Sequence, residues 1–206
     1  MDDPAPFRRA LAAALPDYGV EPTAERLDRL GHYLAMLAAW NQRTRLVGRA
    51  EPELLARRHV GESLFLHRLI PLAGQTLLDL GSGAGFPGLA LQLAFPDLNT
   101  TLVESKQKKA AFLAAVTAQM GMGRVCAERL EALQVQAEIV TVRAIEGMEQ
   151  GPERFQHLLI SGGKLALWIN RSVAESWRGR FLGWHWQSPA LLPGASERAI
   201  LVGERR

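Results

Sequence analysis

The sequence has almost no cysteine: Cys126 is the only one among 206 residues, so no disulfide can form within the chain. Proteins of oxidising compartments commonly depend on several cysteines, which favours a cytoplasmic protein in which Cys126 is a small buried hydrophobic residue.

Long hydrophobic runs are also missing. Charged residues or glycines interrupt each run before the roughly 20 residues that a membrane helix needs, and the apolar stretch at residues 10–15 is too short for a secretory signal. We therefore expect neither export nor membrane association.

Metal-binding patterns are missing as well. The histidines, at positions 32, 59, 67, 157 and 185, show no ligand spacing with the cysteine or with paired acids, so no metal site is predicted. No Ser/His/Asp or Cys/His constellation for nucleophilic catalysis is evident either.

Positive charge is in only small excess, because 24 lysines and arginines against 21 acids give a net charge of +3. So small an excess says little about a polyanionic partner, although its placement says more. Between residues 42 and 59 the chain carries Arg43, Arg45, Arg49, Arg57 and Arg58, with few acids among them. A solvated surface and contact with a polyanion both account for this run.

Hydrophobic residues make up 48% of the chain, which is enough to bury a sizeable core. The first third has helical periodicity, with apolar residues at intervals of three and four over Phe7–Leu15 and again over Leu27–Leu37. Thr23 can cap the start of the second of these helices, and a third helical stretch is expected over residues 53–70. The sequence thus predicts an N-terminal helical extension over residues 1–71.

After Pro71, short runs rich in leucine, valine and isoleucine alternate with helical segments, which is typical of parallel strands joined by crossover helices. The expected strands are 76–80, 100–104, 124–128, 138–143, 164–170, 184–191 and 198–202. Only a Pro-Gly loop separates the last two, so we expect them to pair as an antiparallel hairpin. Residues 72–206 are therefore expected to form an α/β, doubly wound, Rossmann-like domain. Parallel strands closed by an antiparallel pair resemble class I methyltransferases that use S-adenosylmethionine (AdoMet).

The stretch LLDLGSGAGFPGLALQLAF, residues 77–95, combines the end of a strand, a glycine-rich turn and the start of a helix. Such a turn lets backbone approach a ligand closely. A nucleoside triphosphate is disfavoured, because Leu89 stands where a P-loop needs lysine. The spacing of Gly83, Gly85 and Gly88 satisfies the dinucleotide pattern, and Glu104 follows where an acid can accept hydrogen bonds from ribose hydroxyls. A nicotinamide cofactor is thus one alternative.

Asp79 favours AdoMet over a dinucleotide. It lies within the strand directly before the glycines, where a carboxylate attracts the ammonium and sulfonium of AdoMet and repels a pyrophosphate. The other interpretation of Asp79 is an acid that caps the following helix or stabilises the turn. Glu104 does not discriminate, because both ligands carry ribose hydroxyls.

Several segments together resemble the ribosomal RNA small subunit methyltransferase G family, also called glucose-inhibited division protein B. They are WNQRTRLVG from Trp40, RHVGESL from Arg58, LLDLGSGAGFPGLAL, LVESKQKKAAFL, TVRAIEGM around Arg143 and GASERAILV around Arg198. The form Gly-x-Gly-x-x-Pro-Gly is far more specific than a lone glycine motif. The chain departs from the family pattern at Arg45, where asparagine is usual, at Glu62, where aspartate is common, and at 168–170, where Trp-Ile-Asn replaces Leu-Lys-Gly.

The resemblance implies AdoMet-dependent methylation of a guanine N7 in 16S ribosomal RNA, by a cytoplasmic and monomeric enzyme whose substrate is the RNA or the assembling 30S subunit. Guanine N7 has a free lone pair at neutral pH, so the reaction needs no general base, and positioning of the reactants carries the catalysis. Two alternatives stay open: a methyltransferase acting on a small molecule or a protein, and a non-catalytic RNA-binding module.

The expected cofactor contacts follow the glycine turn and the ends of the next strands. They are Asp79, Gly81, Ser82, Gly83, Gly85, Phe86, Glu104, Ser105, Arg129, Leu130, Glu131 and Arg143. Arg143 is also expected to position the substrate, because it ends the fourth strand on the same rim. Its alternative is an ion pair with Glu146 or Glu149. Phe86 is either a stacking partner for adenine or a flipped base, or a packing residue.

The expected RNA contacts are cationic or aromatic side chains near this rim, because phosphate contacts dominate RNA affinity. They are Arg43, Arg45, Arg58, His59, Lys106, Lys108, Lys109 and Arg198. The three lysines open a helix, where positive charge opposes the helix dipole, so a functional role and a solvated surface are equal alternatives for them. For His59 a partly buried helix residue is the equal alternative.

Overall fold

A mostly parallel sheet forms the centre of the computed structural model, which describes residues 3–144 and 148–205. The strand order is β3-β2-β1-β4-β5-β8-β6, and β7 pairs with β8. The strands are β1 (Thr76–Leu80), β2 (Asn99–Val103), β3 (Arg124–Cys126), β4 (Ala137–Arg143), β5 (Leu159–Asn170), β6 (Trp184–Trp186), β7 (Ala190–Leu191) and β8 (Arg198–Arg205).

Strand β1 lies at the point where the chain order reverses, because it pairs in parallel with β2 on one side and with β4 on the other. Helix-containing crossovers connect the parallel strands, so the expected α/β doubly wound architecture is confirmed. In such sheets ligands bind beyond the carboxyl ends of the strands at this reversal. The turn after Leu80 and the end of β4 at Arg143 both lie there.

The antiparallel close of the sheet is also confirmed, since β8 runs antiparallel to β5 and to β6. The expected strand over residues 184–191 is instead two short strands on one edge of β8. Pro189 lies in the break, and proline has no N–H to donate to the ladder. Strand β5 begins earlier than expected, and its register against β4 shifts between Ala137 and Ile139.

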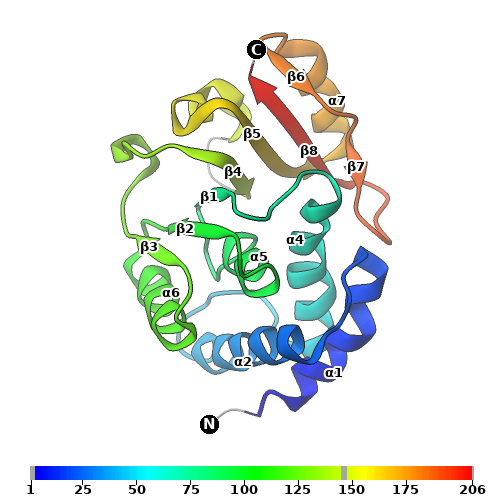
Figure 1. The fold of residues 1–206 in the computed structure, drawn as a ribbon, viewed down its shortest axis with the longest axis vertical. Coiled ribbons are helices and arrows are strands. Elements are labelled where there is room, and N and C mark those ends of the chain that lie inside the picture. Colours follow the sequence, from blue (N-terminus) through cyan, green and yellow to red (C-terminus); the bar gives the residue numbers. More distant parts are fainter. Residues whose placement is uncertain (1–2, 145–147, 206) are drawn as a thin grey trace.

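Helices cover both faces of the sheet (Figure 1). Thr23 accepts a hydrogen bond from the N–H of Arg26 at 3.4 Å, which confirms the expected cap of the second helix. The helices are α1 (Ala5–Ala14), α2 (Ala24–Asn41), α3 (Pro52–Leu54), α4 (Glu62–Leu64), α5 (Gly88–Ala94), α6 (Gln107–Met120) and α7 (Arg171–Arg180). The 3-10 and π-helical segments are η1 (Leu15–Tyr18), η2 (Leu55–Gly61), η3 (Phe65–Arg68), η4 (Leu130–Ala132), η5 (Met148–Gln150) and η6 (Pro152–Leu158).

The helical stretch expected over residues 53–70 is present but not regular. Its middle part, η2, is a π-helix, and it is flanked by the single turns α3 and α4. π-Helical turns inside helices are rare and often lie at functional sites. Here the turn carries Arg57, Arg58 and His59.

The helices before residue 72 pack against the sheet domain. One hydrophobic cluster joins Leu11, Leu34 and Leu64 to Leu89 of α5 and Phe112 of α6, and a second cluster fills the other face of the sheet. Figure 1 shows α2 running along α5 and α6, with α7 beside β8 at the other end. Arg26 and Arg29 of α2 donate hydrogen bonds to the last carbonyls of α5. The described residues form no helix that is both long enough and apolar enough to span a bilayer.

Candidate functional site

The glycine turn after β1 has the backbone conformation that its composition predicts. Gly81, Gly83 and Gly85 have φ angles of 67°, 59° and 100°, in the left-handed region that residues with a Cβ rarely adopt. The N–H of Ser82 donates to the carbonyl of Val103 at 3.0 Å, which ties the turn to the end of β2. The turn therefore holds backbone close to the carboxyl ends of both strands.

Asp79 lies behind this turn and is fully buried. Its Oδ1 accepts a hydrogen bond from the hydroxyl of Thr141 at 2.7 Å, and its Oδ2 accepts one from the N–H of Gly88 at 3.1 Å, at the start of α5. Burial raises the pKa of the Asp79 carboxyl to about 6, although these hydrogen bonds oppose the rise. The side chain thus makes the helix-start contact of the alternative interpretation, and direct cofactor contact by Asp79 stays a prediction.

Glu104 lies directly after β2 and is buried beside the turn. Its Oε2 accepts a hydrogen bond from the N–H of Gly83 at 3.0 Å, and its Oε1 accepts one from the N–H of Lys106 at 2.8 Å. Each carboxylate oxygen can accept more than one hydrogen bond. Glu104 therefore fixes the turn and keeps acceptor capacity toward a ligand.

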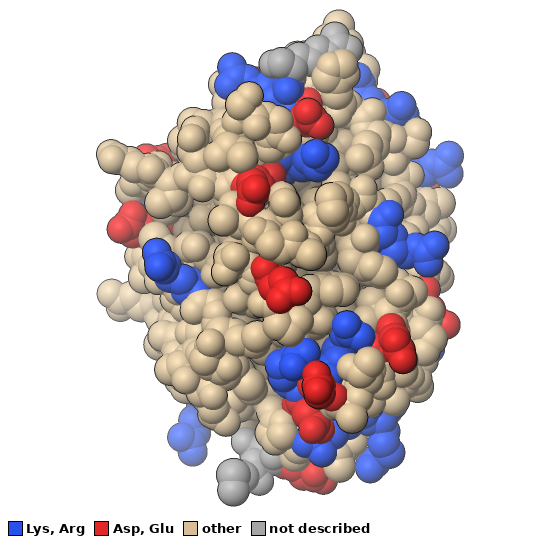
Figure 2. Space-filling view, in the orientation of Figure 1, with Lys and Arg blue, Asp and Glu red and all other residues tan. Residues whose placement is uncertain are grey.

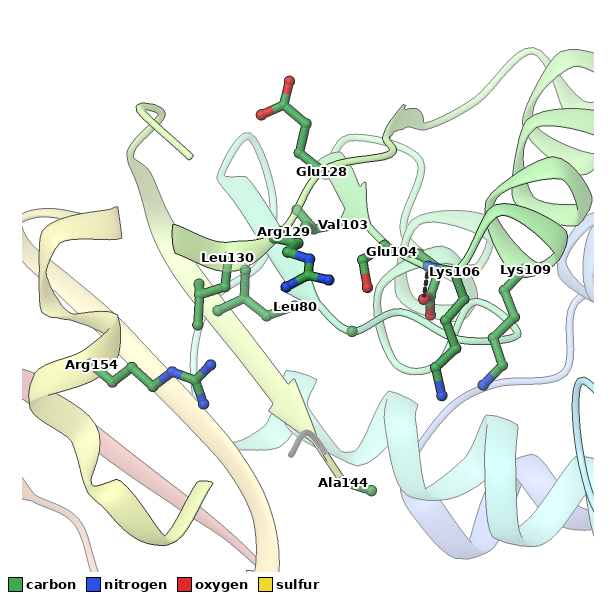
Figure 3. A pocket seen from close by; sticks show the side chains of 12 residues that line it. Leu80, Val103, Glu104, Lys106, Lys109, Glu128, Arg129, Leu130, Ala144 and Arg154 are labelled. Atoms are coloured by element: carbon green, nitrogen blue, oxygen red, sulfur yellow. Dashed lines mark hydrogen bonds between the residues drawn. The ribbon is translucent and has the colours of Figure 1, made fainter. Parts of the chain in front are cut away.

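A cavity of about 380 Å³ opens at this edge of the sheet. Its walls are Leu80, Gly81, Val103, Glu104, Ser105, Lys106, Lys109, Glu128, Arg129, Leu130, Ala144 and Arg154. Figure 3 shows Arg129 and Arg154 on one side, Lys106 and Lys109 on the other and Glu104 between them, while the carboxylate of Glu128 points away. The volume and the mixture of apolar and polar walls are those of a small-molecule site.

The cavity brings together part of the expected cofactor set. Gly81, Glu104, Ser105, Arg129 and Leu130 line it. The other expected contacts, at Asp79, Ser82, Gly83, Gly85, Phe86, Glu131 and Arg143, are not among its walls. Ser82 is buried and donates from its hydroxyl to the carbonyl of Asp79 at 2.8 Å, and Glu131 forms an ion pair with Arg154 at 2.8 Å. Their roles as ligand contacts remain predictions.

Phe86 is a packing residue in this structure. It is buried, and its ring lies 5.6 Å from the ring of Tyr33 and 4.9 Å from the ring of His59, measured between centroids. Tyr33 also donates a hydrogen bond to the carbonyl of Ala84 at 2.6 Å. Burial, with the nearby charges of Arg143 and Arg58, lowers the pKa of His59 to about 4. The N-terminal helices thus support the glycine turn directly.

Arg143 contacts three groups of the helical segment before residue 72. Its guanidinium donates to Glu62 Oε2 at 3.0 Å, to the carbonyl of Arg58 at 2.8 Å and to the hydroxyl of Ser63 at 3.4 Å. Burial lowers its pKa and the charge of Glu62 opposes this. Of the acids proposed as its alternative partners, Glu146 lies outside the described residues, and so does the side chain of Glu149.

Glu62 gathers two further arginines of the expected RNA set. Arg58 and Arg198 lie 3.1 and 2.9 Å from its Oε1, and the glutamate itself is only 1% exposed. Three guanidiniums therefore surround one carboxylate. The sequence indicated the arginines but no role for Glu62, because two of its three partners, Arg143 and Arg198, stand 81 and 136 positions away in the chain.

Of the expected RNA contacts other than Arg58 and Arg198, His59 follows Arg58 in η2 and packs against Phe86. Lys106 and Lys109 line the cavity, whereas Lys108 is exposed on α6, and Arg43 and Arg45 are exposed in the segment after α2.

Ala144 and Arg154 line the cavity but were not among the expected site residues. Ala144 follows the strand end that the sequence located, but no pattern in the sequence distinguishes Arg154. Within the described residues, no group of side chains has the composition of a metal site.

Comparisons with known proteins agree on one family. The family model described as rRNA small subunit methyltransferase G matches residues 26–178. A protein of Halorhodospira halophila named Ribosomal RNA small subunit methyltransferase G is 39% identical over 67% of this chain, and the match spans 66% of that relative. One of the same name from Chloroflexus aggregans is 36% identical over 94% of this chain and 88% of its own length.

Solved structures share the fold. The putative methyltransferase yhhF from Escherichia coli superposes with a TM-score of 0.54, covering 71% of this chain and 84% of its own, at 18% sequence identity. A likeness at this identity bears on the architecture alone.

Proposed function

Because the chain belongs to the rRNA small subunit methyltransferase G family, we propose that it transfers a methyl group from AdoMet to N7 of a guanine in 16S ribosomal RNA. The observation that carries the proposal is the cavity at the carboxyl ends of β1 and β2, where Glu104 and the glycine turn meet. The family membership favours AdoMet over the nicotinamide alternative.

The residues of this cavity fit AdoMet. Glu104 has free acceptor capacity for two neighbouring ribose hydroxyls, and Gly81 exposes backbone without a Cβ in the way. Leu80, Val103 and Leu130 offer apolar surface for an adenine ring. Lys106 and Arg129 can pair with the carboxylate of the amino-acid part. We therefore assign the cavity to the methyl donor and call it the donor cavity.

When bound, AdoMet supplies an electrophilic methyl group on a sulfonium. The residues of the chain need only hold guanine N7 in line with that group, since the lone pair of N7 requires no proton acceptor. Such positioning is worth roughly 7 to 11 kcal/mol of barrier lowering. Arg143, at the carboxyl end of β4, is the residue that we propose to position the acceptor, together with Arg58 and Arg198.

RNA binding in this proposal comes from local cationic groups rather than from a broad basic surface. On the face shown in Figure 2, lysine and arginine side chains are interspersed with acids and with uncharged surface. The net charge of +3 agrees with this distribution. We propose Arg43, Arg45, Lys106, Lys108, Lys109 and His59 as further RNA contacts, and a monomeric enzyme of the cytoplasm.

The experiment that tests the function uses small-subunit particles and naked 16S rRNA from cells that lack this gene. We expect label from AdoMet at one guanine N7, and loss of transfer as salt rises, because phosphate contacts are screened. Label on another base or on protein would contradict the substrate assignment. Transfer to a small molecule without salt dependence would favour the alternative methyltransferase.

A further inference from the structure

A second cavity, of about 520 Å³, lies beside the donor cavity. Its walls come from the ends of β4 and β5, from α7, from β8 and from Glu62 of α4. Ala144 lines both cavities, so the two spaces meet at the end of β4. What is inferred for this space rests on the function proposed above.

One side of the second cavity carries an excess of positive charge. Glu62, Arg143 and Arg198 are among its walls, and Arg58 contacts the same carboxylate without lining the space. Among the described residues, Glu62 is the one carboxylate that pairs with Arg58, Arg143 and Arg198, at 3.1, 3.0 and 2.9 Å. The side chains of Arg58 and Arg198 are 47% and 34% exposed, so both can still reach an anion from solvent. The planar guanidinium matches the geometry of phosphate oxygens. This side of the cavity therefore suits a phosphate group.

Other walls of the cavity are apolar and aromatic. Trp168 and Trp177 line it, and the indole N–H of Trp168 donates to the carbonyl of Glu62 at 2.9 Å. Asn170 carries the one side-chain amide among the described residues that line the space. It ends β5 directly before α7, as the N-cap residue of that helix, but its side chain makes no capping hydrogen bond there. An apolar wall with an uncommitted amide suits a nucleobase, which has a flat apolar face and a polar edge.

The junction between the cavities has an unusual backbone. Ala144 has a φ of 54°, in the left-handed region that residues other than glycine seldom enter. Such conformations persist where the surrounding structure dictates them, and they concentrate at active sites. This residue stands at the junction of the donor cavity and the second cavity.

We propose that the second cavity receives the acceptor nucleotide of single-stranded RNA, with its base against Trp168 and Asn170 and its phosphate on Arg58 and Arg198. Glu62 is then a positioning residue, which holds three like charges together before the RNA arrives. The acceptor base enters from this side and meets the methyl group at Ala144.

Steady-state transfer to small-subunit particles tests the proposal, with four variants: Arg198→Gln, Glu62→Gln, Glu62→Asp and Arg178→Gln. We expect Arg198→Gln to raise KM for the particles at least about tenfold, the loss of one charged hydrogen bond, while the dissociation constant of AdoMet stays unchanged. Glu62→Gln should lower kcat and raise KM, and Glu62→Asp should restore part of both. Arg178→Gln is the control, because Arg178 pairs with Glu175 on α7 and lines neither cavity.

A second readout does not need catalysis. The indole N–H resonance of Trp168 should shift when guanosine 5′-monophosphate is added at millimolar concentration, and it should shift less with guanosine or in Arg198→Gln. The indole of Trp40, which lies against Phe112, should not move. No shift at Trp168, or an unchanged KM in Arg198→Gln with AdoMet still bound, would overturn this inference alone. Failure of the wild-type chain to bind AdoMet or to methylate the RNA would overturn the proposed function instead.

Discussion

The two carboxylates beside the glycine turn show that the sequence can predict where a residue lies but not which way its side chain points. Asp79 is the penultimate residue of β1 and Glu104 directly follows β2, and the sequence predicts that both face the ligand. The structure turns Asp79 to the first N–H of α5 and leaves Glu104 at the cavity wall. Sequence position located both residues, but the direction of each side chain depends on partners, such as Thr141, from other strands.

Glu104→Gln should weaken AdoMet binding. The amide replaces one acceptor oxygen with a donor, which faces a backbone N–H of Gly83 or Lys106 and disturbs the turn. We expect the dissociation constant to rise about tenfold or more in calorimetry, as for loss of one charged hydrogen bond. Glu128→Gln is the matched control, because that carboxylate points away from the cavity (Figure 3), and equal losses in the two variants would contradict the assigned role of Glu104.

His59 should make the fold sensitive to acid. Its pKa is about 4 in the folded chain against an ordinary 6.5, so the unfolded chain binds more protons between these pH values. The stability that neutral His59 contributes is present above pH 6.5 and is lost as the pH falls toward 4, at up to about 1.4 kcal/mol per pH unit.

The measurement is the free energy of unfolding of the wild type and of His59→Gln from denaturant titrations between pH 4 and 6.5. The wild type should lose stability relative to the variant as the pH falls. For Asp79→Asn the change is in the opposite direction, and the wild type should gain stability relative to that variant as the pH falls. The reason is that the pKa of Asp79 is raised from 3.8 to about 6, so the folded chain binds more protons than the unfolded chain between these values. Parallel curves for wild type and His59→Gln would show that His59 titrates normally.

At the scale of elements, the apolar runs between helical segments located the strands well, because this pattern is local and does not depend on how the strands are arranged in space. It could not find the break at Pro189, where β8 pairs with two short strands instead of one. Nor could it find the π-helical turn η2, because helical periods differ too little over seven residues. In that turn Arg58 forms an ion pair with Glu62, whereas the next residue, His59, packs against Phe86.

Close packing between α5 and β1 depends on Gly88. A Cβ added there would lie 2.5 Å from the Cβ of Asp79, a contact that requires one of the two elements to move. We expect Gly88→Ala to lower the free energy of unfolding by about 3 kcal/mol, as for an overpacked core. In Gly179→Ala a Cβ meets nothing within 4 Å, so that variant should gain about 0.5 to 1 kcal/mol in α7. Thermal unfolding of both variants checks the pair, and similar changes would contradict the packing argument.

The hydroxyl of Tyr33 links α2 to the glycine turn. Tyr33→Phe removes its hydrogen bond to the carbonyl of Ala84 and leaves that buried acceptor unpaired. We expect a loss of about 1 kcal/mol in stability and a severalfold weaker AdoMet affinity, measured by calorimetry on the folded variant. Tyr18→Phe is the control, because no hydrogen bond of the Tyr18 hydroxyl is found within the described residues. If Tyr33→Phe bound AdoMet as tightly as the wild type, the helical extension would not support the turn.

At the scale of the whole molecule, the glycine motif and the alternation of strands with helices located the edge of the sheet that carries the donor cavity, because both are local patterns. The group of Arg58, Arg143 and Arg198 around Glu62 could not be located in this way. Arg143 and Arg198 reach Glu62 only because the helical segment before residue 72 packs against the ends of β4 and β8. The expected division into residues 1–71 and 72–206 also has a shared hydrophobic cluster across it, which composition does not reveal.

The central claim is that the methyl donor occupies the cavity between the glycine turn, Glu104 and Leu130. A crystal structure of the chain with S-adenosylhomocysteine tests it most directly. We predict the product in that cavity, with its ribose hydroxyls on Glu104. Product bound in the arginine-lined cavity instead, or at neither place under saturating conditions, would contradict the account.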